Sequence, residues 1–341
     1  MENYLLRTGV TLSMLDELSV IHVAGTKGKG STSAMCESIL RHHGFKTGFY
    51  SSPHLVVVRE RIRLGGRLVS KKQFAQHFHR VYDLLFKSQA YDGDMPKYFA
   101  FLTVLAFNVF LKERVDVAVI EVGIGGHVDY TNVLRKVPVV GITALGLDHT
   151  SILGNTLAEI AEAKAGIMKP GCVAYTCGQP PEAMAVLRRV ACPLKIAPDC
   201  KNYDTQITLP VNLDVYKTNA SLAIQLAHAW MKFGKANLNS RNTVKSITSG
   251  KILIQNGIKE INSPYPMNID KTTNGVFDQL VTTVIPDETV AGLRECKWPG
   301  RYQVIHKDYA TFYLDGAHTV ESMEICANWF KTNSRYCLYL L

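Results

Sequence analysis

An apolar segment rich in β-branched residues is followed by a glycine-rich loop near the N-terminus, and this combination constrains the fold most strongly. Residues 18–24 read LSVIHVA, and the loop GTKGKGST follows at 25–32. The apolar spacing after the loop, up to Gly44, is typical of a helix. Backbone N–H groups of a glycine loop at a helix N-terminus form a cradle for anions. The sequence therefore predicts a strand, a phosphate-binding loop and a helix.

The loop does not follow the strict GxxxxGK[ST] pattern, because Val23 stands at the first glycine position and Gly30 follows the lysine. Lys29 is still the natural phosphate contact, since it lies where the loop enters the helix. A glycine-rich turn without a ligand is the alternative, and the flanking strand and helix argue against it. The predicted nucleotide-binding residues of the loop are Gly25, Thr26, Lys27, Gly28, Lys29, Gly30 and Ser31.

The order of elements predicts an α/β fold. A helix is expected over 98–114, a strand over 115–123 and a further strand over 137–146. Because these strands are continuously apolar and alternate with helices, they favour a mostly parallel P-loop-type sheet with helices on both faces. We expect an ATP-binding domain at 1–234 and a polar insertion or linker at 235–287, with disorder as one interpretation. Residues 288–341 are expected to begin a second, incomplete Rossmann-like α/β domain.

Three residues along these elements are candidates for chemistry. Glu121 ends a buried strand, where open α/β sheets place their sites, and a carboxylate there can hold Mg²⁺. A structural ion pair is the alternative for Glu121. For His149 taken alone, a hydrogen-bonded histidine and a metal ligand are equally good descriptions. Lys164 lies within a predicted helix, where a surface ion pair is the ordinary interpretation.

A basic cluster follows residue 53. Arg59 and Arg61, together with His54, could face an acidic substrate, although a solvated charge cluster on a loop describes them equally well.

Several blocks resemble one family. The GTKGK loop is similar to the nucleotide loop of the Mur ligase superfamily, and within it the chain resembles folylpolyglutamate synthase. The matching blocks are YSSPHLVVVRERIR (50–63), VAVIEVGIGG (117–126), ITALGLDHTSILGNT (142–156), WPGR (298–301) and YLDGAHTVES (313–322). The resemblance covers nearly the whole chain and suggests a chain shortened at both ends.

This resemblance implies roles for individual residues. The implied magnesium ligands are Ser52, Glu121, His149 and Lys164, with Lys164 carbamylated to help hold a second magnesium. Lys29, Lys164 and His149 would be the catalytic residues. Arg301, Asp315 and His318 would bring contacts from the second domain to ATP. The implied cofactors are ATP and two Mg²⁺ ions, with a monovalent cation as a further candidate.

The implied reaction is the ATP-dependent addition of L-glutamate to the γ-carboxylate of a tetrahydrofolate (poly)glutamate through an acyl phosphate, with release of ADP. Three alternatives remain open: a dihydrofolate synthase, a plain P-loop NTPase or kinase, and an inactive shortened isoform that only binds nucleotide or folate. The family usually has a His-Gln pair where this chain has Val215 and Tyr216, and His127 follows GIGG where the family often has Arg.

Composition limits the partners and the location. The chain has 38 Lys and Arg against 29 Asp and Glu, but the basic residues are scattered, so nucleic acid is not predicted. The eight Cys include no CxxC pair, which suits reduced thiols. Residues 98–111 are too short to span a bilayer, and the N-terminus lacks a transit-peptide pattern. We expect a cytosolic monomer without a membrane partner, and a mitochondrial form would need a longer N-terminus.

Overall fold

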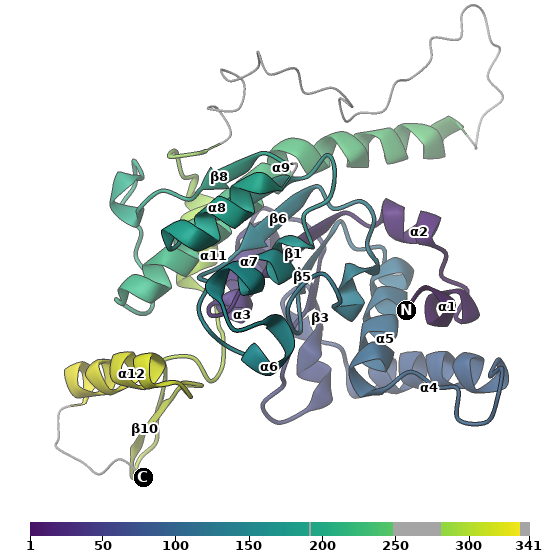
Figure 1. Ribbon diagram of the computed structural model, residues 1–341, viewed down its shortest axis with the longest axis horizontal. Coiled ribbons are helices and arrows are strands. Elements are labelled where there is room, and N and C mark those ends of the chain that lie inside the picture. The colour runs from purple at the N-terminus through teal and green to yellow at the C-terminus, as the bar shows by residue number, and fades with distance from the viewer. Residues whose placement is uncertain (191, 248–280, 335–341) are drawn as a thin grey trace, which may run out of the picture.

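The computed structural model describes residues 1–190, 192–247 and 281–334, and its centre is an eight-stranded sheet (Figure 1). The order across the sheet is β4-β3-β2-β5-β1-β6-β7-β8. The strands are β1 (Val20–Ala24), β2 (Thr47–Tyr50), β3 (Ile62–Leu64), β4 (Arg67–Leu68), β5 (Val117–Glu121), β6 (Val139–Ile142), β7 (Val173–Thr176) and β8 (Leu194–Ile196).

The sheet is mainly parallel, as the sequence predicted. The run from β2 to β8 pairs in parallel, whereas β3 and β4 form an antiparallel extension at one edge. The central strand β1 lies between β5 and β6, and Val23 is in register with Glu121. The connection after β1 runs to β2 on one side, whereas the connection after β5 crosses to β6 on the other side of β1. Open α/β sheets bind ligands at the carboxyl ends of strands around such a point.

Helices cover both faces of the sheet. One face is covered by α3 (Lys29–His42), α9 (Asp214–Ile247) and α11 (Asp287–Arg294), and the other by α5 (Tyr98–Glu113), α7 (Leu157–Ala165) and α8 (Pro181–Arg189). The remaining helices of this part are α1 (Glu2–Arg7), α2 (Leu12–Glu17), α4 (Lys71–Lys87) and the short α6 (Thr150–Leu153).

The strand sequences explain why both faces are covered. In β1, Ile21 and Val23 pack into one apolar cluster, whereas Val20 and Ala24 pack into the other. A strand that is apolar on both faces cannot leave either one in water without losing roughly 25 cal/mol per Å² of apolar area. The continuous apolar pattern of β1 therefore required the two layers of helices.

Two helices lie across the predicted domain boundaries. Helix α9 continues to Ile247, past the predicted end of the first domain at 234, because its sequence has no proline to interrupt the hydrogen-bonded backbone. Helix α11 packs against α3, where Ser38 Oγ donates to the carbonyl of Gly292 at 2.7 Å. Residues 288–296 therefore belong with the first domain. The middle of the predicted insertion, 248–280, lies outside the described residues.

The second unit follows Cys296 and lies at the edge of the molecule in Figure 1. It consists of an antiparallel hairpin, β9 (Gln303–His306) and β10 (Thr311–Leu314), and of α12 (Val320–Asn333). The predicted two short strands and a helix are therefore present, and residues 335–341 of the predicted second domain lie outside the described residues. Trp329 is buried and its ring meets those of Tyr302 and Tyr313 edge-on at 5.3 and 5.6 Å.

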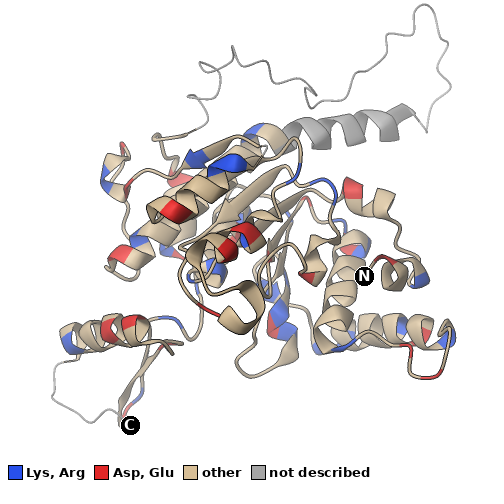
Figure 2. Cartoon of the chain, in the orientation of Figure 1, with Lys and Arg blue, Asp and Glu red and all other residues tan. Residues whose placement is uncertain are grey.

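Positions of basic and acidic residues are interspersed along the described elements (Figure 2). Within the described residues, no helix combines the length and the apolar character needed to cross a bilayer.

Candidate active site

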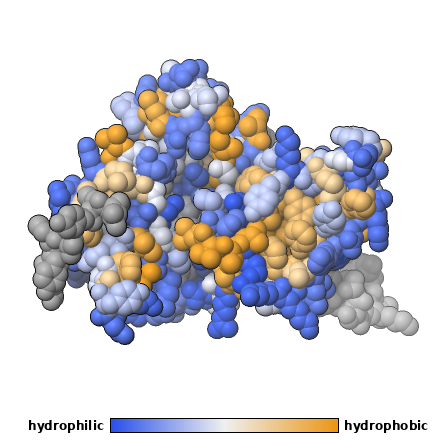
Figure 3. All heavy atoms as spheres, turned by 90° about the horizontal axis from the view of Figure 1, so that it is seen from below, coloured by the Kyte–Doolittle hydropathy of each residue, from blue (hydrophilic) through white to orange (hydrophobic). Residues whose placement is uncertain are grey.

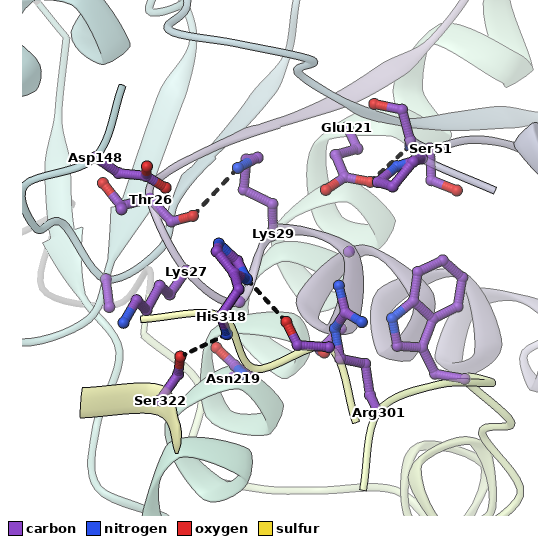
Figure 4. Close-up of a pocket in the computed structure, with 18 of the residues that line it drawn as sticks. Thr26, Lys27, Lys29, Ser51, Glu121, Asp148, Asn219, Arg301, His318 and Ser322 are labelled. Carbon is purple, nitrogen blue, oxygen red and sulfur yellow. Dashed lines mark hydrogen bonds between the residues drawn. The ribbon is translucent and has the colours of Figure 1, made fainter. Parts of the chain in front are cut away.

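A cavity of about 1030 Å³ lies at the carboxyl ends of the central strands, between the first domain and the second unit. It brings together residues that are far apart in the sequence, from the glycine loop to the start of α12 (Figure 4). The predicted site residues that line it are Thr26, Lys27, Gly28, Lys29, Gly30, Ser31, Ser52, Glu121, His149, Arg301, Asp315 and His318. Gly25 and Lys164 do not line the cavity, and they contact each other behind the loop.

Two glycines of the loop lie so close to neighbouring side chains that a Cβ atom would not fit. Gly28 has φ 88°, and a Cβ atom there would lie 2.2 Å from Asn219 Oδ1. A Cβ atom on Gly25 would lie 1.8 Å from Thr143 Oγ1. The N–H groups of Thr26 and Lys27 both donate to the carbonyl of Ala144. The loop is therefore fixed between β6 and α9, and it opens α3 with its N-terminus facing the cavity.

The two lysines of the loop have different partners. Lys29 Nζ donates to the carbonyls of Gly25 and Thr26 at 3.1 and 3.3 Å, so its ammonium group lies over the loop. In the view of Figure 4 it lies between Thr26 and Glu121. Lys27 instead reaches the second unit, where its Nζ lies 3.2 Å from a carboxylate oxygen of Glu321. Lys29 is thus the cation placed for a phosphate, whereas Lys27 joins the two units.

Glu121 is the last residue of β5, and its side chain is buried at the edge of the cavity. It is 5% exposed and accepts a hydrogen bond from the backbone N–H of Ser52 at 3.1 Å. Burial raises the pKa of the Glu121 carboxyl to about 7, although the nearby charges of Lys29 and Arg301 oppose the rise. No ion pair to Glu121 occurs in the described part of the chain, so the structural ion pair considered for it is absent.

The cavity is lined by oxygen donors of the kind that magnesium takes. Among the described residues, no group of three or more His, Cys, Asp and Glu side chains could hold a metal by itself. The cavity instead offers the Glu121 and Asp148 carboxylates together with the hydroxyls of Ser31 and Ser52. Oxygen donors of this kind suit Mg²⁺, which usually takes one or two carboxylates and completes its shell with water and substrate phosphate.

Lys164 is buried behind the glycine loop rather than exposed. Its side chain is 4% exposed, and its Nζ donates to the carbonyl of Gly25 at 2.8 Å. The surface ion pair considered for this residue is therefore wrong, because α7 turns Lys164 toward the core. Burial, with the charge of Lys29 nearby, lowers the pKa of the Lys164 amine to about 7. A substantial fraction of the amine is therefore neutral and nucleophilic at neutral pH.

His149 differs from the other predicted ligands because it is largely in solvent. It lies in the left-handed region with φ 51° at the start of α6, and its side chain is 55% exposed. Its backbone N–H donates to Asp148 Oδ1 at 2.8 Å. Asp148 lines the cavity as well, and sequence reasoning did not single it out although it stands beside His149 in the LGLDHT block.

The basic residues that follow residue 53 do not all face the cavity. Arg61 lines the cavity, where its Nε bonds to His54 Nδ1 at 2.9 Å and its guanidinium lies 5.5 Å from the ring of Tyr98. Arg59 points away and donates to the carbonyl of Val69. Arg63, which sequence reasoning missed, lines the cavity between the rings of Trp298 and Phe49, at 4.8 and 5.3 Å.

We expect Arg63→Ala to loosen Trp298 and to lower the free energy of unfolding by about 1–2 kcal/mol, the usual range for a desolvated cation–π contact. Thermal melts and tryptophan fluorescence check this. Arg67, an exposed residue of β4, gives the matched control Arg67→Ala. Equal effects of the two alanine variants would contradict a role for the Arg63–Trp298 stack.

One wall of the cavity is apolar. It includes Tyr98, Phe99 and Tyr130, whose rings sequence reasoning did not assign to a site. Exposed apolar side chains also line it, with Leu55 at 56% and Val128 at 73% exposure. Apolar patches stand among polar residues on the face of the molecule seen in Figure 3. The cavity thus joins an anion-binding end to an aromatic end.

The second unit adds polar groups to the same cavity. Asp315 Oδ2 accepts the N–H of Tyr302 at 2.9 Å, which joins the start of β9 to the end of β10. Arg301 Nη1 donates to the carbonyl of Gly300, and the positive charge of Arg301 acts on Glu121. His318 Nδ1 bonds to the carbonyl of Gly316, and Ser322 Oγ accepts the backbone N–H of His318 (Figure 4).

The two residues that replace the His-Gln pair of the resembling family lie in different environments. Val215 lines the cavity, whereas Tyr216, the next residue of α9, is 5% exposed and packs in the core. Asn219, one turn further along α9, also faces the loop and was missed by sequence reasoning.

The chain is similar in sequence to named proteins. It is 42% identical over 347 residues to the mitochondrial folylpolyglutamate synthase of Bos taurus, covering 99% of this chain and 55% of that protein. For the Homo sapiens protein of the same name the identity is 43% over 341 residues, covering 97% of this chain and 54% of the relative. The chain thus spans about half the length of these relatives. No protein-family model matches it.

Solved structures agree with these sequence matches. A point mutant of L. casei FPGS superposes with a TM-score of 0.76 at 25% identity, covering 98% of this chain and 76% of that one. An FPGS–AMPPCP–folate complex gives a TM-score of 0.75 at 25% identity, covering 98% and 75%.

Proposed function

The chain is homologous to the folylpolyglutamate synthases over nearly its whole length, and from that relationship we propose that it is an ATP-dependent amide ligase. It adds L-glutamate to the γ-carboxylate of a reduced folate and releases ADP and phosphate. The observation that carries this proposal is one cavity that combines a helix N-terminus with Lys29, a buried carboxylate and an aromatic wall.

The nucleotide occupies the end of the cavity formed by the glycine loop. The N–H groups that open α3 and the ammonium group of Lys29 contact the phosphates, because both provide positive charge where the phosphates carry negative charge. Arg301 and His318 approach from the second unit, and the contact between Lys27 and Glu321 keeps the two units together. Phosphoryl transfer depends chiefly on such positioning and charge stabilisation.

The folate occupies the other end. Its ring system packs against Tyr98, Phe99 and Tyr130, and its carboxylate tail lies near Arg61. The γ-carboxylate attacks the terminal phosphate of ATP and becomes an acyl phosphate. The amine of L-glutamate then attacks the acyl carbon, phosphate leaves, and an amide remains. No nucleophile of the protein is required, so its residues act by binding and by stabilising charge.

Magnesium would be held by Ser52, Glu121 and His149, and a carbamylated Lys164 would help to hold a second ion. When bound, it would neutralise charge that gathers on the transferring phosphoryl group. A carbamate on Lys164 would add a negative oxygen donor there, and the pKa of about 7 leaves the amine able to react with CO₂.

Substitution of Lys164 tests the carbamate. We expect a ¹³C carbamate signal in ¹³C-bicarbonate buffer that is absent from Lys164→Arg, with activity lower by on the order of 10–100-fold. Lys169→Arg is the matched control, because Lys169 lies five positions later in the same segment. A carbamate signal that persists in Lys164→Arg would contradict this assignment.

Product analysis separates the ligase from the dihydrofolate synthase alternative. With MgATP and labelled L-glutamate, mass spectrometry is expected to find tetrahydrofolate lengthened by glutamyl residues and dihydropteroate unchanged. Dihydropteroate as the preferred acceptor would reverse the assignment. The cytosolic location and the monomeric state stay predictions, and the Bos taurus and Homo sapiens relatives are named mitochondrial.

A further inference from the structure

Two cysteines lie opposite each other where β7 and β8 begin, away from the cavity. Ala174 pairs with Leu194 in the parallel register of these strands, and Cys172 and Cys192 each lie two positions before that pair. Neighbouring strands are about 4.8 Å apart, and the Cα atoms of disulfide-bonded cysteines are usually about 4.4–6.8 Å apart. Aligned residues on adjacent strands also point to the same face. The backbone thus already provides the separation that a disulfide needs.

The two thiols contact each other but differ in exposure. A hydrogen bond joins their side chains, and both cysteines are reduced. Cys172 is 1% exposed, whereas Cys192 is half-buried. The hydrogen bond from Cys192 and the charge of Lys169 lower the pKa of the Cys172 thiol, and the same contact raises that of Cys192. A reagent from solvent can therefore reach Cys192 first, and the Cys172 thiol lies beside it.

We propose that Cys172 and Cys192 form a dithiol site that low-molecular-weight disulfides, such as oxidised glutathione, convert to an intramolecular disulfide. Cys192 loses its proton to water and its sulfur attacks one sulfur of the reagent, and the reagent's S–S bond breaks to release one glutathione thiolate. Cys172 then loses its proton to water and attacks the Cys192 sulfur of the mixed disulfide, releasing the second glutathione. Two protein thiols are oxidised and one glutathione disulfide is reduced to two thiols.

The position of the pair predicts what the cross-link does. Both cysteines precede their strands, at the end of the sheet opposite to the cavity, which is lined by Cys177 at the other end of β7. The disulfide would join the edge strand β8 to β7 without touching the glycine loop. We therefore expect a higher melting temperature and little change in nucleotide binding.

The test treats the purified chain with oxidised glutathione at neutral pH, alkylates the remaining thiols, and maps the product by intact-mass and peptide mass spectrometry. The expected result is the loss of two alkylatable thiols, a cross-linked pair of peptides containing Cys172 and Cys192, and no retained glutathione. Cys172→Ser is expected to retain one glutathione on Cys192. Cys192→Ser is expected to leave Cys172 unmodified.

Cys326→Ser is the matched control, because Cys326 is also half-buried and lies in α12. It is expected to form the cross-link as the unsubstituted chain does. The proposal is overturned if no cross-link forms, if it joins other cysteines, or if Cys192→Ser loses thiols to the same extent as the control. Because Cys192 is half-buried, its serine variant should fold, and a thermal melt verifies that.

Discussion

Replacing Lys29 with alanine is expected to lower the rate of ATP-dependent turnover by on the order of 100- to 1000-fold, the usual cost of losing one group that stabilises developing charge. Lys29 is the cation at the mouth of the glycine loop, and its Nζ lies over the carbonyls of Gly25 and Thr26. These carbonyls do not require a lysine, because they accept other hydrogen bonds readily. The main loss should therefore be in nucleotide contacts rather than in folding.

Binding of a fluorescent ADP analogue, measured beside turnover and a thermal melt, checks this expectation. Lys46→Ala serves as the control, because Lys46 is exposed beside Glu113 and does not line the cavity. The Lys29 variant should melt like the control and bind nucleotide more weakly. Normal nucleotide affinity and turnover in Lys29→Ala would contradict the prediction that Lys29 contacts the phosphates.

Replacing Glu121 with glutamine is expected to abolish activity yet stabilise the magnesium-free chain above neutral pH. The pKa of the Glu121 carboxyl is about 7 in the folded chain against an ordinary value of 4.5. Between these values the folded state keeps a proton that the unfolded state has lost, so stability falls as pH rises and stays low above pH 7. Glutamine carries no charge and should avoid this penalty, which is on the order of 3 kcal/mol.

Urea denaturation of both chains at pH 5 and pH 8, in the presence of a chelator, measures the difference. It should be small at pH 5 and favour the glutamine variant at pH 8. Glu162→Gln is the control, because the Glu162 side chain is 77% exposed and its replacement should leave stability nearly unchanged at both pH values. A Glu121→Gln variant that is less stable than the parent chain at pH 8 would show that the carboxylate is stabilised without a metal.

The sequence was sufficient to predict the central sheet, and most of the residues it suggested for a site line one cavity. The apolar strands that end at Ala24, Glu121 and Ile142 are neighbours in the sheet, so residues that follow them had to meet at one edge. The glycine loop could be located because its residues are required by local backbone geometry. These features depend on short-range patterns that a single chain displays directly.

Other parts of the site depend on packing between distant segments. Arg63 is one of several arginines after residue 58, and only the approach of Trp298 distinguishes it from Arg59. Lys164 has the sequence surroundings of a surface residue, and its burial follows from how α7 packs against the loop. Tyr98 looked like part of a buried helix, yet it is 58% exposed at the cavity.

The boundary between the two units was missed for a similar reason. The segment DETVAGLR reads as a short amphipathic helix that could begin either unit. Gly292 determines that this helix packs against α3. A Cβ atom there would lie 2.7 Å from the Cα atom of Ile39, so only glycine allows α11 to approach α3 this closely. The turn that carries Trp298 and Arg301 is thereby attached to the first domain.

The most direct test of the ligase proposal is the rate of ADP release from MgATP, measured with tetrahydrofolate and L-glutamate together and with each left out in turn. We predict release that requires both substrates and that is lost in Lys29→Ala. Release that continues unchanged without folate and glutamate would identify a plain NTPase, and no release with all three substrates would contradict catalysis by this chain.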